Sequence, residues 1–491
     1  MTDAINSLPS IGLSTLPMAD LVRCGAIDDV RTSTPGSLAE EILFAVALAQ
    51  IGAMDPAGSE TGALSRLENS VKGAAGQVEL SIAARIELCF AQLEALKPRN
   101  PILEALQVVE TELNSIAGRT GDALRARAAV VRGRTLLRNR KILDARAAMQ
   151  KSLSLATSIG DRYGVAEAEL ALGMADAWNG CPRPAERHFS NAREIWAGLG
   201  NRIRLGDVDY ESGICAFDTR EYDEARSLFD RARKAADAAG AGSARTLRIG
   251  YQQGAASLAA GDMEAAQTQL SSTLDLAVKA SDSYRAMMCR IDLGRCALQR
   301  ARGSKGGQRI AALSVAKGMY AAVSAGLSEQ DREPGAFGGL HATLLEAGLM
   351  GEGVYAEDGL TKADGADLLG RSADAFGTLD RERPRCLMFR IAAAEAYGEA
   401  AAALKKRWGA KSQEKATLAL MNARRRVEAA AACELAAAMG INLDTTEKRQ
   451  QAFRLTWQTE SREVSGVTYV RLRPEAGDAG MPWAPVVDAS S

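Results

Sequence analysis

The sequence predicts an all-α fold: an α-solenoid of stacked antiparallel helical hairpins that winds into a right-handed superhelix and ends in a C-terminal helical cap. The first observation is a regular series of glycines, in which Gly133, Gly173, Gly213, Gly254 and Gly294 follow one another at spacings of 40, 40, 41 and 40 residues. The second is a fixed pattern of small and large apolar residues after each of the first four. Self-similarity at a period of roughly 20 to 50 residues is typical of repeat architectures.

Each repeat unit predicts two helices that cross closely. An alanine lies twelve residues after the glycine, a large apolar residue four residues further on, and a small residue three beyond that. Glycine and alanine let two backbones approach, while the large side chain fills the space beside them. The four sets are Ala145, Met149 and Ser152; Ala185, Phe189 and Ala192; Ala225, Phe229 and Ala232; and Ala266, Leu270 and Thr273. A fifth, degraded copy keeps Gly294, Ile310 and Leu313.

This order of residues resembles the tetratricopeptide repeat (TPR) family, which has a small residue in the first helix and an alanine, an aromatic and a small residue in the second. Leu172-Gly173 followed by Ala185, Phe189 and Ala192 matches best, and the resemblance covers residues 120–320 clearly. The units are about 40 residues long instead of about 34. In this they are similar to the longer repeats of bacterial signalling and regulatory proteins and of kinesin light chains. The resemblance implies a fold and leaves the function open.

Composition and periodicity divide the chain into four regions. Residues 1–37 are rich in Ser, Thr and Pro and predict a loosely ordered or capping N-terminal segment. Helical repeats are predicted over 38–325, where Ala105 and Val109 mark an earlier repeat in which Leu93 replaces the glycine. Residues 326–440 predict a divergent helical region. Residues 441–491 predict a short helix or a β-hairpin, followed by a disordered tail. The strands of the hairpin would be 453–458 and 467–473, and its turn would be at Ser465-Gly466.

Composition also limits the class of protein. The formal net charge is -1, which gives no overall attraction to nucleic acid or to a membrane. No apolar run of about 18 residues and no secretory signal pattern is present, so we expect a cytoplasmic protein without a membrane partner. The eight cysteines include no C-x-x-C pair, and His188 and His341 are the only histidines. Neither a metal nor another cofactor is therefore predicted.

The sequence contains no recognisable catalytic motif. It lacks a G-x-x-x-x-G-K-[ST] phosphate loop, an H-E-x-x-H pair and a G-x-S-x-G elbow. The loop 303–307 holds a lysine but lacks the apolar strand that precedes a phosphate loop. His188 is expected to be a solvated histidine on a helix surface. The sequence predicts that the protein is not an enzyme, and an enzyme with an unrecognised site remains an alternative.

The candidate binding site is the concave groove that stacked hairpins of this family line with their first helices. The resemblance implies that residues six and three before the glycine, and one, four and five after it, face this groove. From these offsets the predicted partner-binding residues are Arg127, Arg134, Arg138, Trp178, Asp207, Tyr210, Phe217, Arg248, Tyr251 and Arg295. Arginines together with aromatics suit a protein or peptide partner. We therefore expect an adaptor, a sensor or a regulatory module.

A carboxylate clamp of the family has Lys and Asn where this chain has Val130 and Arg134, so the C-terminal carboxylate of a peptide is not the expected ligand.

A second candidate surface is basic. Residues 405–426 contain eight Lys or Arg and one Glu, and such a cluster can bind the phosphates of nucleic acid. The simpler interpretation is a solvated turn whose cations lie near a helix C-terminus. A regulator associated with nucleic acid is thus the alternative function, and the expectation is that nucleic acid is not the partner.

Overall fold

The computed structural model describes residues 17–54, 61–95, 97–139, 141–178, 182–219, 221–326, 342, 345–346, 348–350, 352–355, 368, 459–464, 467–472 and 484–485. The chain divides into two compact units. Unit 1 comprises Met1–Cys215 and Glu224–Gly250, and unit 2 comprises Ala216–Asp223 and Tyr251–Ser491. The predicted C-terminal cap and the basic cluster 405–426 lie outside the described residues.

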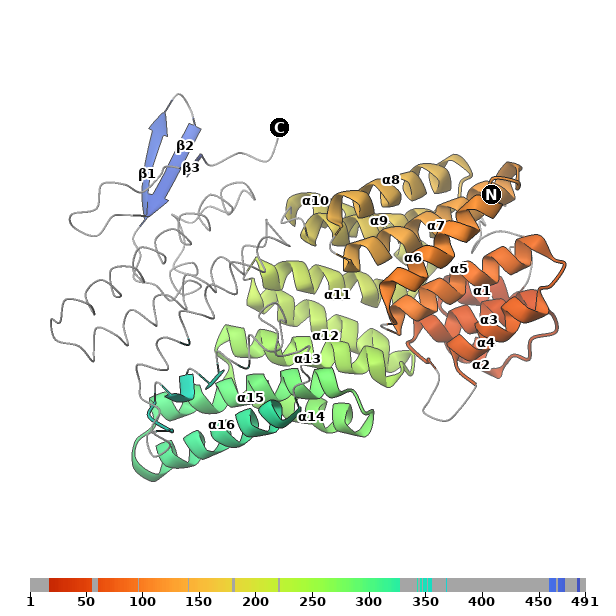
Figure 1. The fold of residues 1–491 in the computed structure, drawn as a ribbon. Coiled ribbons are helices and arrows are strands. Elements are labelled where there is room, and N and C mark those ends of the chain that lie inside the picture. Colours follow the sequence, from red (N-terminus) through yellow and green to blue (C-terminus); the bar gives the residue numbers. More distant parts are fainter. Residues whose placement is uncertain are drawn as a thin grey trace. The chain divides into compact units, whose positions relative to one another are not determined.

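Consecutive antiparallel helices make up the repeats (Figure 1), which confirms the predicted α-solenoid of stacked hairpins. The helices that lie wholly or mostly in unit 1 are α1 (Pro17–Cys24), α2 (Ile27–Thr32), α3 (Leu38–Gln50), α4 (Ala63–Gly73), α5 (Val78–Glu94), α6 (Arg99–Leu113), α7 (Gly118–Arg138), α8 (Ile142–Ser158), α9 (Arg162–Trp178), α10 (Pro182–Leu199), α11 (Arg202–Asp218) and α12 (Tyr222–Ala238). Helix α13 (Ser243–Ala260) begins in unit 1 and continues in unit 2, which also holds α14 (Met263–Lys279), α15 (Ser283–Gly303) and α16 (Gly306–Gly326).

The repeated glycines are where the two helices of a hairpin cross. A Cβ atom added to Gly173 would lie 2.5 Å from Phe189 Cε1, and one added to Gly213 would lie 2.6 Å from Phe229 Cε1. Gly133 meets Met149 and Gly254 meets Leu270 in the same way. The alanines of the pattern, Ala145, Ala185, Ala225 and Ala266, are fully buried. The predicted contact between glycine and the large apolar residue is therefore confirmed in four repeats.

A second series of glycines ends the second helices of the hairpins. Gly160 and Gly200 follow α8 and α10 with φ of 72°, a left-handed conformation that favours glycine. The next backbone N–H folds back, so that Asp161 N donates to Ala156 O and Asn201 N donates to Trp196 O. This arrangement satisfies carbonyls at the helix C-terminus. It also sets the short turn into the next repeat.

The fifth repeat, in unit 2, differs from the prediction. Ile310, which was expected in the helix crossing, is 69% exposed, while Ala312, Ala316 and Val323 are buried. A Cβ atom on Gly294 would meet Leu345 Cδ2 at 2.6 Å. The pattern of buried residues in α16, which begins at Gly306, is shifted relative to the second helices of the other repeats. Leu345, which lies beyond the repeat, fills the space at Gly294. Ala105, expected in the core of the earliest repeat, is likewise exposed, and its neighbour Leu106 is buried.

Three short strands near the C-terminus form an antiparallel sheet in the order β1-β2-β3. Their bounds are β1 (Thr459–Val464), β2 (Val467–Leu472) and β3 (Ala484–Pro485). In the hairpin Val464 pairs with Val467 and Thr459 with Leu472. The second strand is where the sequence predicts it; the first lies at 459–464 rather than at 453–458. β3 falls within the stretch for which a disordered tail is predicted.

The segment from α1 to the end of α3 contacts α9 and the loops that precede α11 and α13, all within unit 1. The amide of Asn201 donates to Val22 O at 3.5 Å, and Arg31 Nη2 donates to Gly240 O at 2.9 Å. Gly242 N donates to Ile51 O at 2.8 Å. Met18, Ala19 and Val22 of α1 belong to the same hydrophobic core as Trp196 and Ile203. The N-terminal helices thus cover one rim of the repeats.

Candidate functional site

The first helices of successive hairpins in unit 1 are joined by buried ion pairs, here called the ion-pair ladder: Glu87, Arg127, Glu167, Arg204 and Asp207. Arg127 of α7 binds Glu87 of α5 with two hydrogen bonds, Nη2 to Oε2 at 2.7 Å and Nε to Oε1 at 2.8 Å. Its Nη1 also reaches Glu167 Oε2 of α9 at 3.3 Å. One guanidinium therefore links three helices.

The ladder continues toward α13. Arg204 of α11 lies 3.0 Å from Glu167 Oε1 and 3.0 Å from Asp207 Oδ2. Asp207 in turn pairs with Arg245 at the start of α13. Tyr163 connects the ladder to the N-terminal helices, because its hydroxyl accepts from Gln50 Nε2 at 2.7 Å and lies 3.4 Å from Arg204 Nη2. Ion pairing thus runs through α5, α7, α9, α11 and α13.

The ladder residues are buried, and the charges of Arg204 and Arg127 act on the ionisation of Glu167. The Arg127, Glu87 and Glu167 side chains are 6%, 1% and 3% exposed. Burial by itself raises the pKa of Glu167, but the guanidinium groups of Arg204 and Arg127 outweigh it and lower that pKa. Each charge compensates another, so the ladder serves to hold neighbouring repeats in register. Loss of one member would leave its partner charged and buried.

Next to the ladder lies a second group of charges, here called the inner cluster: Glu94, Arg134, Arg138, Glu211 and Arg248. Arg134 Nη2 and Arg138 Nη2 share one oxygen of Glu94, at 2.8 and 3.2 Å. The side chains of Arg134, Arg138 and Arg248 are 11%, 19% and 25% exposed. Unlike the ladder, the inner cluster is therefore in contact with solvent.

The inner cluster includes charges from helices that are not neighbours in this layer. Glu94 lies on α5 and Arg248 on α13, with α7, α9 and α11 between them in the layer. Packed helices lie about 8 to 10 Å apart, so in a flat layer these two charges would be far apart. Instead, Arg248 is among the guanidinium groups that lower the pKa of Glu94. We call the side of unit 1 that carries Glu94, Arg134, Arg138, Glu211 and Arg248 the inner face.

Aromatic rings support the arginines of this face. The guanidinium carbon of Arg127 lies 4.6 Å and that of Arg134 5.0 Å from the centre of the Phe90 ring. Arg248 lies 4.4 Å from the Tyr210 ring in the same way. Such cation–π contacts fix the direction of a guanidinium without using its hydrogen-bond donors.

The predicted groove residues of unit 1 fall into two groups. Arg127, Asp207 and Tyr210 are 6%, 7% and 7% exposed, and the contacts they make are within the protein. Tyr210 packs against Phe229 with ring centres 5.8 Å apart. Residues one and five after the glycine are half-buried and reach the solvent; they are Arg134, Arg138, Met174, Trp178 and Ile214. Arg248, six before its glycine, also reaches the solvent.

The remaining predicted residues lie in unit 2. Tyr251 donates its hydroxyl hydrogen to Asp292 Oδ2 at 3.1 Å, and Arg295 Nη1 lies 3.2 Å from Asp292 Oδ1. Burial raises the pKa of Asp292. Phe217 packs against Tyr222 with ring centres 5.5 Å apart. Within this unit the structure joins Tyr251 and Arg295 through one carboxylate.

Sequence reasoning missed the partners of these arginines. Glu87, Arg127 and Glu167 follow one another at intervals of 40 residues, as do Glu94 and Arg134. Residues at equal positions of neighbouring repeats are side by side in a solenoid. The alternation of negative and positive side chains at one position of successive repeats therefore predicts ion pairs between neighbouring repeats.

We expect stability to depend on pH through Glu94. Burial raises its pKa, but Arg134, Arg138, Arg248 and Arg204 together lower it to about 2. A carboxyl whose folded-state pKa is below its unfolded value stabilises the fold above about pH 4.5 and loses that contribution as pH falls toward 2. Urea unfolding at pH 5 and pH 3 should show the parent losing about 1 to 2 kcal/mol more than Glu94→Gln. Equal losses would contradict the assignment.

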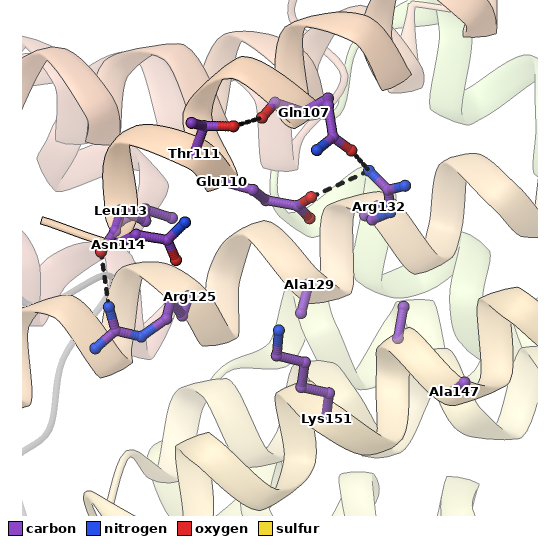
Figure 2. Close-up of a pocket in the computed structure, with 11 residues that line it drawn as sticks. Gln107, Glu110, Thr111, Leu113, Asn114, Arg125, Ala129, Arg132, Ala147 and Lys151 are labelled. Carbon is purple, nitrogen blue, oxygen red and sulfur yellow. Dashed lines mark hydrogen bonds and ion pairs between the residues drawn. The ribbon is translucent and has the colours of Figure 1, made fainter. Parts of the chain in front are cut away.

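Helices α6, α7 and α8 of unit 1 line a pocket of about 450 Å³ (Figure 2). Its charged side chains mostly have partners within the protein. Arg132 Nη1 lies 3.2 Å from Glu110 Oε2, and Arg125 donates to Leu113 O, to Ile116 O and to Asp122. Lys151 extends from α8 into the opening. The arrangement is a polar recess whose arginines are already paired.

His188 is not the solvated histidine that the sequence predicts. Its side chain is 23% exposed, its Nδ1 pairs with Glu169 and its Nε2 lies 3.5 Å from Asp176 Oδ2. Arg146 Nε is also bound to Asp176, at 2.8 Å. The prediction was wrong because α9 presents two carboxylates to the face of α10 that holds His188.

Neither a metal centre nor a membrane-spanning helix is present in the described residues. Over that part of the chain, no three His, Cys, Asp or Glu side chains gather as a metal centre would require. No helix there combines the length and the apolar character needed to cross a lipid bilayer.

No family model matches the chain, and no curated protein matches it in sequence. Solved structures do match. A Rap protein complexed with Competence and Sporulation Factor is 11% identical with a TM-score of 0.52, over 81% of this chain and 99% of that one. The apo form of the quorum sensor NprR from B. thuringiensis has the same identity, TM-score and coverage. At this identity the likeness concerns the fold. The chain therefore has a helical-repeat fold of the tetratricopeptide type.

Proposed function

We propose that the protein is a non-enzymatic regulatory or adaptor module that binds a peptide or a segment of a partner protein on the inner face of unit 1. The observation that carries this proposal is the division of that face into two kinds of residue. The ladder is sealed and holds the repeats, while arginines and apolar residues at the next positions stay in contact with solvent. Such a preformed surface loses little entropy when a ligand binds.

The exposed set also has a suitable chemistry. Trp178 and Arg138 occupy the same position in consecutive repeats, with Met174 and Arg134 one turn earlier. Tryptophan and arginine are enriched among residues that dominate binding energy, and methionine adapts to different apolar surfaces. A row of this kind fits an extended chain or an amphipathic helix that combines acidic and apolar side chains.

The fold neighbours support a regulatory role. One was solved with Competence and Sporulation Factor bound, and the other is described as a quorum sensor. The proposal includes a cytoplasmic location, because Cys89 and Cys289 are free thiols within the core and such thiols persist in a reducing compartment.

The test begins with a peptide selected from a random library on the full chain. Trp178→Ala should weaken its binding about 10- to 100-fold, the range expected when a central aromatic contact is removed. Leu143→Ala is the matched control, because Leu143 is an apolar residue of α8 that is 76% exposed. Isothermal titration calorimetry measures both affinities. If all selected peptides bind Trp178→Ala as tightly as the parent, the inner face is not the binding site.

A further inference from the structure

The inner cluster has more positive charge than its carboxylates neutralise. Glu94 is shared by Arg134 and Arg138. Arg248 lies 3.9 Å from Asp207 Oδ1, but Asp207 already pairs with Arg204 and Arg245. Glu211 forms no ion pair of its own within the described part of the chain. The guanidinium groups of Arg134, Arg138 and Arg248 therefore lie around a single ion-paired carboxylate, that of Glu94.

The hydrogen bonding of these arginines also indicates that an acceptor is missing. The Nε–H groups of Arg134 and Arg248, like that of Arg204 in the ladder, are buried without an acceptor among the described side chains. Burial lowers the pKa of Arg138, and the neighbouring Arg134 and Arg248 lower it further, against the opposing effect of Glu94. Burial of cations without full compensation is costly. A surface that tolerates this cost is suited to an anion supplied from outside.

We infer that Arg134, Arg138 and Arg248 form a binding site for a carboxylate or phosphate oxyanion, carried by an acidic peptide that occupies the inner face. This inference rests on the proposed function and specifies the chemistry of its ligand. The guanidinium groups approach from α7 and α13, so an oxyanion between them would bind both helices at once. Charge-assisted and bidentate hydrogen bonds of arginine to such groups are among the strongest in proteins.

The carboxylate of Glu211 competes with the ligand for the guanidinium groups of Arg134, Arg138 and Arg248. Burial raises the pKa of its carboxyl, while Arg248, Arg134 and Arg138 favour its ionised form. When ionised, it supplies part of the negative charge that the ligand would bring. Glu211→Gln removes that charge with little change of shape. The site therefore predicts opposite effects at two neighbouring positions: loss of an arginine weakens an acidic ligand, and loss of Glu211 strengthens it.

The experiment uses the full chain and three probes: hexaglutamate, its neutral isostere hexaglutamine, and inorganic phosphate. Hexaglutamate should bind more tightly than hexaglutamine, and added salt should weaken it through screening. Arg138→Met should weaken hexaglutamate at least 10-fold, in keeping with the loss of one charge-assisted contact. Arg138→Lys should keep part of the affinity, and Glu211→Gln should tighten binding several-fold.

Arg132→Met is the matched control, because Arg132 lies on the same helix and is paired with Glu110 in the recess of Figure 2. It should leave the affinity for hexaglutamate unchanged. Unfolding by urea verifies that each variant is folded. Competition by phosphate supports the oxyanion site, whereas phosphate binding without hexaglutamate binding overturns the assignment to a peptide.

Equal effects of Arg138→Met and Arg132→Met would also overturn the site. Tight binding of selected neutral peptides that depends on Trp178 but not on Arg138 would overturn this inference and leave the proposed function standing.

Discussion

Arg127→Met should lower the free energy of unfolding by about 3 to 5 kcal/mol, the range seen when one partner of a buried ion pair is removed. The reason is that the carboxylates of Glu87 and Glu167, which are 1% and 3% exposed, lose the guanidinium that they share. Arg132→Met on the same helix is the control. Arg132 is 30% exposed, and breaking an exposed pair costs about 0 to 1 kcal/mol.

A double-mutant cycle separates this effect from a loss of packing. Glu87→Gln combined with Arg127→Met removes the bidentate pair as a whole, so the double variant should be clearly more stable than the sum of the two single changes predicts. Equilibrium unfolding in urea gives the four free energies. Strict additivity would show that Arg127 stabilises the protein through its hydrocarbon chain alone.

Gly213→Leu should destabilise the protein by about 1 to 3 kcal/mol through overpacking. Even the Cβ atom would lie 2.6 Å from Phe229 Cε1 and 2.8 Å from Cδ1, before the rest of the side chain is placed. Gly318→Leu is the control, because a Cβ atom there has nothing within 4 Å and α16 gains a better helix former. Thermal melts of both variants provide the comparison.

A double-mutant cycle also tests the crossing of α11 and α12 at Gly213 and Phe229. In a Phe229→Ala background, where the ring is absent, Gly213→Leu should cost less than in the parent, because the new side chain can occupy the vacated space. A melting temperature of Gly213→Leu equal to that of the parent would contradict the close crossing of α11 and α12.

The sequence predicted the local part of the fold well because its signals are local. Gly173 and Phe189 lie sixteen residues apart in one hairpin, so their contact follows from helix geometry and repeat length alone. The neighbour of Gly294 was not predictable in this way. Leu345 lies far beyond the repeat, and only tertiary packing brings it to that crossing.

The candidate site stays a prediction. The offsets from the glycine select Arg134, Arg138 and Trp178, which are half-buried in the structure. The same offsets do not distinguish Tyr210, whose burial depends on Phe229 from α12 and Arg248 from α13. Whether a groove residue faces a ligand or its neighbours is decided by pairs of side chains on adjacent repeats.

The central claim is that ligands bind the layer of α7, α9, α11 and α13 in unit 1. The most direct measurement is photo-crosslinking of a selected peptide that carries a photoreactive residue, followed by mass spectrometric mapping of the adducts. We expect adducts on inner-face residues of these helices, such as Met174, Trp178 and Ile214. Adducts confined to α6, α8, α10 or α12 would contradict it.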